Sequence, residues 1–480
     1  MSLTRNASFS LISSVLQIGV ILVTVPIYLR LIGPQRYGVI VIVWLLFDYF
    51  QLFNFGLDKA VTAMLARLRQ SLDESSILFG TAIAISLLAG AIGMIVMFAA
   101  IIPILSNWMG IGPELIAEAG WSIRFIALLL PLWITASVFR GLLQAHERFF
   151  ELSVAQFAMA VAFQIAPLAM AKWLGPDLQT VLFTGAIARS TLPLVMIFLA
   201  LRRGPRMRML AASREWARKL TQYGFWTSVT NIVSPLIVNL DRYIVASKLG
   251  PAAVGLYNVP LNLIMRVQIL PTSLQSALFP RMSMSGEDDR GKLSRDGVVG
   301  LGIIMAPLLV CGAVFIDPFL KLWIGDFVAP ELSQVGEILI VGVWFNSLAY
   351  VPYAQLQAEQ RPNLIARLHV LEILPFVALL WFAIGRWGIV GAATAWSLRA
   401  IVDSLLLFAA TGLTGVICWT LLFPTGLLVL LVATLLPHET TLLTNLALGA
   451  GCVAAILIWS ATVAPASLRT LVLRAARWRR

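Results

Sequence analysis

The hexapeptide Gly33-Pro34-Gln35-Arg36-Tyr37-Gly38 separates two long apolar runs near the start of the chain. Gly and Pro in a short loop favour a tight turn between two helices. A related hexapeptide, Gly250-Pro251-Ala252-Ala253-Val254-Gly255, stands 217 residues later, again between two apolar runs. The pair predicts an internal duplication in which each repeat begins with a helical hairpin.

Two further matches support this duplication. Pro113-Glu114-Leu115 recurs as Pro330-Glu331-Leu332 at the same offset, and Leu143-Gln144-Ala145 recurs as Leu356-Gln357-Ala358 at an offset of 213. All matches keep the same order, so the predicted repeat unit comprises six helices. An even number of spans gives both units the same orientation, related by an axis along the membrane normal. We expect two pseudo-symmetric lobes around a central cavity that opens to each side in turn.

The composition places these repeats in a membrane. Of 480 residues, 59% are hydrophobic and 12% are charged, whereas soluble domains carry about 25% charged residues. At roughly 20 residues per span, the fold class is an all-α integral membrane protein of about 14 transmembrane helices. Two C-terminal helices lie outside the six-helix lobes. The apolar runs predict helices at 9–31, 37–57, 77–104, 117–143, 149–173, 178–201, 218–247, 252–279, 296–321, 331–357, 363–383, 388–410, 415–436 and 442–464.

Positive charge orients the predicted helices. With the N-terminus inside, 23 Lys and Arg residues fall in cytoplasmic segments and six in outer loops, so both termini are predicted to be cytoplasmic. The net charge of +12 therefore indicates membrane topology rather than nucleic-acid binding. The predicted segments are an N-lobe at 1–201, a basic cytoplasmic linker at 202–217, a C-lobe at 218–410, helices 13 and 14 at 411–464, and a basic cytoplasmic tail at 465–480.

No catalytic constellation is recognisable. None of the six lysines precedes Ser or Thr, which excludes a Walker A sequence, and the three histidines and three cysteines are scattered. We predict no catalytic residue, no metal site and no cofactor. A membrane-bound polysaccharide polymerase or ligase is the enzymatic alternative, and the short outer loops disfavour it.

The informative residues are charges inside the predicted helices. An arginine in the bilayer costs at least about 2.5 to 3.5 kcal/mol, so it normally faces a wet cavity or a partner. A guanidinium also matches the oxygens of a phosphate. We therefore predict an anionic ligand, with five arginines as candidate cavity cations: Arg189, Arg266, Arg399, Arg242 and Arg124. A sixth, Arg140, lies close enough to the inner end of its helix to snorkel, as Arg124 does near the outer end.

Several structural alternatives stay open for these charges. Arg399 has Asp403 one turn on, so an ordinary i,i+4 ion pair competes with a cavity role. Arg189 and Arg266 have no acid within a turn. Asp48 can bind a coupling cation or pair with an arginine. The acids counted in the helices are Asp48, Asp241, Glu372 and Asp403, of which we take Asp48, Asp241 and Asp403 as coupling or charge-pair candidates.

Longer stretches around the hairpin motifs carry a family resemblance. They are Tyr28-Leu29-Arg30-Leu31-Ile32-Gly33-Pro34, Phe55-Gly56-Leu57-Asp58, Asn239-Leu240-Asp241-Arg242-Tyr243, Lys248-Leu249-Gly250-Pro251 with Gly255-Leu256-Tyr257, and Leu278-Phe279-Pro280-Arg281. These stretches, within a similarity from about residue 5 to residue 410, resemble O-antigen type polysaccharide flippases of the multidrug/oligosaccharidyl-lipid/polysaccharide exporter superfamily.

The resemblance implies translocation of an undecaprenyl-pyrophosphate-linked oligosaccharide across the bacterial inner membrane, with a cationic cavity that takes the pyrophosphate. The implied cargo is an O-antigen or other surface polysaccharide unit. Candidate partners are a polysaccharide polymerase and the chain-length machinery. A cation-coupled multidrug exporter of the same superfamily is the main alternative, and an acid-dominated cavity would distinguish it.

Overall fold

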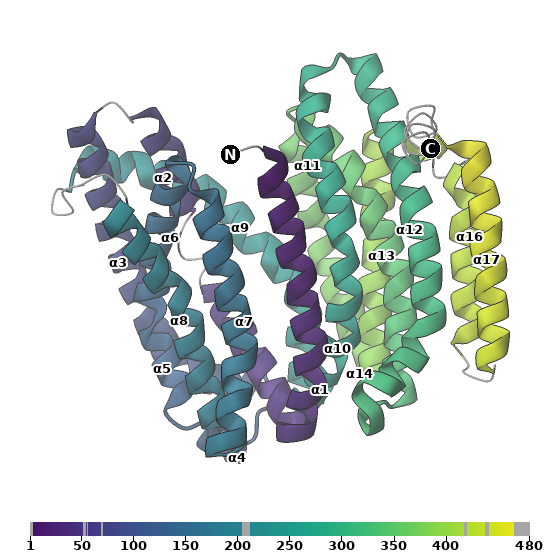
Figure 1. Cartoon of the computed structure of the whole chain (residues 1–480), viewed down its shortest axis with the longest axis horizontal. Helices are drawn as coiled ribbons and strands as arrows, with labels where there is room; N and C mark the ends of the chain where they lie inside the picture. The colour runs from purple at the N-terminus through teal and green to yellow at the C-terminus, as the bar shows by residue number, and fades with distance from the viewer. Residues whose placement is uncertain are drawn as a thin grey trace. The chain divides into compact units, whose positions relative to one another are not determined.

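A computed structural model describes residues 3–50, 54, 56–68, 71–203, 212–416, 420–436 and 441–464 (Figure 1). Every regular element in these ranges is a helix, which confirms the predicted all-α class. A helix satisfies all of its backbone hydrogen bonds within one segment, as a bilayer requires. The predicted tail and residues 204–211 of the predicted linker lie outside the described residues.

The chain divides into two compact units, Met1–Gly255 and Leu256–Arg480. The elements of the first are α1 (Leu3–Phe50), α2 (Leu57–Arg67), α3 (Leu72–Pro103), the π-helix η2 (Ile104–Trp108), α4 (Pro113–Ala119), α5 (Ser122–Leu128), α6 (Leu130–Ala145), α7 (Phe149–Leu174), α8 (Leu178–Arg203) and α9 (Arg214–Leu249). The boundary falls within α10 (Pro251–Met265). The second unit continues with η3 (Arg266–Gln268), α11 (Ile269–Met284), α12 (Glu287–Ile324), η4 (Gly325–Phe327), α13 (Pro330–Ala358), α14 (Pro362–Ala410), α15 (Thr414–Val416), α16 (Leu422–Leu435) and α17 (Leu442–Val463).

Many of these helices suit a bilayer. Within the described residues, ten are long and apolar enough to cross a membrane. Large apolar side chains such as Leu88, Ile95 and Leu374 are exposed, as they are where a helix faces lipid rather than water. Both α1 and α14 contain one glycine with non-helical torsions, Gly33 (φ 77°, ψ 163°) and Gly388 (φ 57°, ψ −135°), each near a predicted helix break. The total of about 14 spans stays a prediction.

Two predicted helices are interrupted by proline. The predicted helix 117–143 is divided among α4, α5 and α6. Gly120, with a φ of 53°, ends α4, and Pro131 in the first turn of α6 has no N–H to continue the hydrogen-bond ladder from α5. The predicted helix 252–279 is broken by the 3-10 turn η3. There Pro271 cannot donate to the carbonyl four residues earlier, so the backbone tightens just before it.

The backbone repeats along the chain in the way the sequence predicts. Non-glycine residues with positive φ in the described ranges are Glu147 (φ 60°) and Gln360 (φ 58°), which are 213 residues apart. Each follows the end of a helix, and the next residue donates back into that helix: Arg148 N to Leu143 O and Arg361 N to Leu356 O, both at 3.0 Å. Glycines with positive φ recur similarly, in the pairs Gly33 and Gly250, Gly110 and Gly325, and Gly175 and Gly388. These matched turns support the duplication.

The two hairpin motifs contact each other within the first unit. A Cβ added to Gly255 would lie 2.7 Å from the Pro34 carbonyl oxygen, and one added to Gly38 would overlap the Pro251 carbonyl. Real Cβ atoms essentially never approach a neighbour closer than 3.0 Å. The glycine that closes each motif is therefore required by the backbone of the other motif.

The C-terminal helices α16 and α17 pack on the second unit. Both contact α12, and α16 also contacts α13 (Figure 1). The indole of Trp344, which is fully buried, donates from Nε1 to Thr425 Oγ1 at 2.9 Å. Trp459 Nε1 donates to the carbonyl of Thr420 at 3.1 Å. The Trp344 bond thus attaches α16 to α13, and the Trp459 bond joins α17 to the residues just before α16.

Candidate functional site

Arg189 forms an ion pair with Asp48 in the first unit. Arg189 lies 11 residues into α8, roughly 16 Å along the helix at 1.5 Å per residue, and its Nη2 contacts Asp48 Oδ1 of α1. The two residues are 141 positions apart. The side chain of Arg189 is 20% exposed and that of Asp48 is 54% exposed. Of the two roles left open for Asp48, the structure shows pairing with an arginine.

Three aromatic rings surround the Arg189 guanidinium. Its Cζ lies 5.2 Å from the ring centroid of Trp44, 5.3 Å from that of Trp133 and 5.8 Å from that of Phe163. We call these four residues the Arg189 box. Trp133 is held in turn, because its Nε1 donates to Ser190 Oγ at 3.0 Å. Cation–π contacts on several sides stabilise the charge and hold the guanidinium in place.

Arg399 occupies a comparable but more buried place in the second unit. Its Nε lies 3.4 Å from Glu372 Oε2, with side-chain exposures of 13% and 7%. Its Cζ lies 5.3 Å from the ring centroid of Phe376. The i,i+4 alternative is wrong, because Asp403 instead contacts His369, whose Nε2 lies 3.5 Å from Asp403 Oδ1. The turn at Gly388 folds the two halves of α14 together, so the partners come from the other half rather than from the same helix.

The two arginine sites share one element of the repeat. Phe163 and Phe376 are 213 residues apart, and Arg189 and Arg399 are 210 apart. In each unit the guanidinium of the arginine makes a cation–π contact with the ring of the corresponding phenylalanine. The acids differ, because Arg189 takes a half-exposed Asp48 from α1 and Arg399 takes a buried acid from α14. The repeat therefore conserves the cation–π pair and varies its accessibility.

Arg266 lies at the helix break between α10 and α11. It is half-buried and heads the 3-10 turn η3, and no ion pair recorded among the described residues includes it. Next to it, Gln268 Nε2 donates to Asn346 Oδ1 at 2.6 Å, and Tyr350 Oη donates to Gln268 Oε1 at 3.2 Å. Polar groups at a broken helix are typical of a wet or functional region within a membrane protein.

The remaining candidate arginine positions, Arg242 and Arg124, have other contact partners. Arg242 Nη1 donates to Asn239 Oδ1 at 3.1 Å, one turn earlier in α9, and Asp241 is buried. Arg124 is exposed on α5, with its Cζ 5.5 Å from the ring centroid of Phe98. Among the described residues of the first unit, no hydrogen bond, ion pair or cation–π contact joins Arg124 or Arg242 to the Arg189 box. Their grouping around one ligand stays a prediction.

Sequence reasoning missed one buried acid and the aromatic rings. Glu337 is buried in α13 with 1% exposure, inside the predicted helix 331–357, so the count of four acids was too low. An acid within an apolar helix was a visible signal. Trp44, Trp133 and Phe163 carried no signal, because aromatic residues are common in any membrane helix. Only the tertiary fold shows that they surround a charge.

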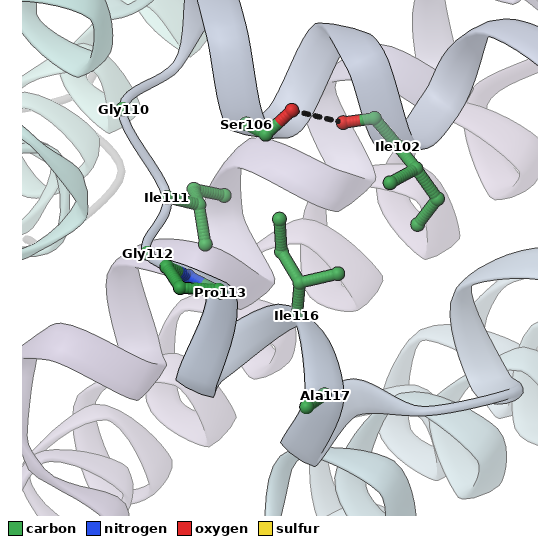
Figure 2. A pocket seen from close by; sticks show the side chains of 8 residues that line it. All are labelled: Ile102, Ser106, Gly110, Ile111, Gly112, Pro113, Ile116 and Ala117. Atoms are coloured by element: carbon green, nitrogen blue, oxygen red, sulfur yellow. Dashed lines mark hydrogen bonds between the residues drawn. The ribbon is translucent and has the colours of Figure 1, made fainter.

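One apolar cavity lies away from the charges. Its volume is about 580 Å³, and it is bordered by the end of α3, η2 and α4 (Figure 2). Figure 2 shows apolar side chains around it, with Ser106 Oγ donating to the Ile102 carbonyl at 3.0 Å. No candidate arginine lines it. In the part of the chain that the structure describes, no group of three or more His, Cys, Asp or Glu residues could hold a metal ion.

Comparisons with known proteins agree with this architecture. A family model described as "Polysaccharide biosynthesis protein" matches residues 27–329. A putative O-antigen transporter of Shigella flexneri is 24% identical over 408 residues, which cover 85% of this chain and 97% of that protein.

Two solved structures show the same fold. The lipid II flippase MurJ in an inward closed conformation aligns with a TM-score of 0.76 and 13% identity, over 96% of this chain and 99% of that one. An inward-facing multidrug resistance MATE transporter aligns with a TM-score of 0.69 and 13% identity, over 84% and 96% of the two chains.

Proposed function

The chain belongs to the polysaccharide biosynthesis protein family, and we propose that it is a flippase for a lipid-linked oligosaccharide. The proposed cargo is an undecaprenyl-pyrophosphate-linked surface polysaccharide unit, carried across the bacterial inner membrane by alternating access. The O-antigen transporter that aligns along nearly its whole length supports this class of cargo. Both termini are proposed to be cytoplasmic, and a polysaccharide polymerase and the chain-length machinery are proposed partners.

The observation that carries the proposal is the Arg189 box. A pyrophosphate needs a permanent positive charge with several N–H donors in a fixed geometry, which a guanidinium supplies. Arg189 has that charge near the middle of a membrane helix, is held by three rings, and stays partly accessible. We assign Arg189 the contact with the cargo's phosphate.

The other arginines take secondary roles in this proposal. Arg266, Arg242 and Arg124 are proposed to attract acidic sugars and phosphate along the path of the cargo. Arg399 is proposed to be structural, because its buried pair with Glu372 leaves little of the guanidinium for a ligand. This assignment separates two arginines that the sequence alone treats as equivalent.

The test compares Arg189→Ala with Arg36→Ala in a strain that lacks the chromosomal gene. Arg36 pairs with Glu118 at 2.6 Å, so its removal also breaks an ion pair of the first unit. Arg189→Ala is expected to lower translocation at least tenfold and to leave lipid-linked oligosaccharide on the cytoplasmic leaflet. Arg36→Ala is expected to keep most activity. Normal translocation by Arg189→Ala at normal protein level would refute the proposal.

A cation-coupled multidrug exporter is the second candidate. The half-exposed carboxylate of Asp48 is the type of group that binds an organic cation, and the Arg189 guanidinium that it contacts already lies over aromatic rings. Arg189 within the same box opposes a cationic ligand, which is why we rank this function second. Export of ethidium by the protein, lost in Asp48→Asn, would favour it. The polymerase or ligase alternative is set aside, because the relatives that span most of the chain are transporters and flippases.

A further inference from the structure

We infer that Asp48 is an internal competitor for the cargo's phosphate, occupying Arg189 in the empty protein and displacing the phosphate at release. The inference rests on the proposed role of Arg189 and adds the group that regulates it. Asp48 and Arg189 contact each other directly, so a phosphate that binds the same guanidinium face must take the place of the carboxylate.

The two partners differ in freedom to move. The guanidinium of Arg189 lies among three rings, and the Trp133 ring is tied through Ser190, whose Oγ donates to the Ala186 carbonyl at 2.8 Å. Asp48 is half-exposed, so its carboxylate can turn into water with little desolvation cost. Exchange therefore proceeds by movement of Asp48 while the cation stays in place.

Competition of this kind suits a carrier. A fixed guanidinium in a partly dry aromatic box would bind a pyrophosphate tightly, because charge-assisted hydrogen bonds are strong. A site that must also release its ligand needs binding that is favourable but reversible. A carboxylate that returns to the arginine lowers the affinity for cargo. For a half-exposed ion pair we expect roughly a five- to tenfold effect, which corresponds to about 1 to 1.4 kcal/mol.

The second unit lacks this exchange. Arg399 pairs with Glu372, and that carboxylate is almost fully buried, so leaving the arginine would cost it its cation without giving it access to water. The repeat offset of 217 places Met265 at the position that corresponds to Asp48. No acid therefore stands at that point of the second repeat. The structure assigns the exchangeable pair to the first unit.

The test measures binding of farnesyl pyrophosphate to the purified full chain in detergent by isothermal titration calorimetry. Asp48→Asn is expected to bind the probe five- to tenfold more tightly than the wild type. Glu118→Gln is the matched control, because it frees Arg36 from its ion pair and changes the net charge by the same amount without touching Arg189. Its affinity should stay within twofold of the wild type. Asp48→Ser is a second charge-removing variant, and Asp48→Glu should keep wild-type affinity.

The outcomes separate this inference from the proposed function. Loss of binding in Arg189→Ala with tighter binding in Asp48→Asn supports both. Loss in Arg189→Ala with unchanged or weaker binding in Asp48→Asn and Asp48→Ser overturns the competitor role and leaves the cargo site standing. Unchanged binding in Arg189→Ala overturns the cargo site itself. An equal gain in Glu118→Gln would show that net charge alone explains the effect, and it would also overturn the competitor role.

Discussion

Replacing Arg399 with alanine should destabilise the protein far more than replacing Arg189. Arg399→Ala removes the guanidinium beside the buried carboxylates of Glu372 and Asp403, which stay in place with His369 Nε2 3.5 Å from Asp403 Oδ1. Two unit charges 3.4 Å apart attract by about 5 kcal/mol at an effective dielectric constant of 20. Removing one partner of a buried pair costs about 3 to 5 kcal/mol. We expect a loss in that range for Arg399→Ala.

Arg189→Ala provides the internal comparison. Its partner Asp48 is half-exposed, and water can solvate the carboxylate that remains. An ion pair of this kind contributes about 0 to 1 kcal/mol, to which the loss of cation–π contacts adds about 1 kcal/mol. A loss of about 3 to 5 kcal/mol for Arg399→Ala against about 1 to 2 kcal/mol for Arg189→Ala gives an expected gap of about 1 to 4 kcal/mol. Thermal unfolding of each purified variant in one detergent, followed by tryptophan fluorescence, measures it.

The double variant Arg399→Leu with Glu372→Leu completes the test. It removes both charges, and replacing a buried pair by apolar groups is often neutral for stability. We expect it to recover most of the loss of Arg399→Ala. If Arg399→Ala unfolds at the wild-type temperature, or if Arg189→Ala loses as much stability, the assignment of structural and functional arginines is refuted.

Two further predictions concern packing. Gly38→Ala should cost about 1 to 3 kcal/mol of stability, because the added Cβ meets backbone that cannot move aside. The control Gly19→Ala, also in α1, meets nothing within 4 Å and should change stability by less than about 1 kcal/mol. Thermal unfolding of both variants measures the difference, and the reverse order would contradict the contact. Trp344→Phe removes the hydrogen bond to Thr425 and should speed backbone hydrogen exchange in α16. The control Trp387→Phe changes an exposed indole and should leave that exchange unchanged. Equal exchange rates in both variants would show that the bond does not hold α16.

Local patterns explain which parts of the fold the sequence could predict. Apolar runs predict helices because a bilayer admits few other backbones. The Gly-Pro motifs predict hairpins because Gly33 adopts a positive φ and proline restricts its neighbours. Proline also explains the two missed interruptions, since the positions of Pro131 and Pro271 were visible in the sequence. These features depend on residues close together in the chain.

The pairing of charges was not predictable in the same way. Asp403 stands one turn from Arg399, yet Arg399 contacts Glu372 in the other half of α14, beyond the break at Gly388, and Asp403 contacts His369. Sequence spacing shows which residues share a helix face, but a partner beyond a break in the helix or on another helix can lie closer. Such partners become known only when the packing of the helices is known.

The sequence by itself determined that this protein is helical and lies in a membrane, and it predicted an internal duplication and cations for an anionic cargo. Tertiary structure alone decided that Asp48 neutralises Arg189 and that three aromatic rings hold that arginine. It also decided that the corresponding Arg399 pairs with a buried acid, Glu372. The physical reason is distance along the chain. Helix formation and membrane insertion depend on local composition, whereas ion pairing depends on atoms brought together from helices up to 141 residues apart.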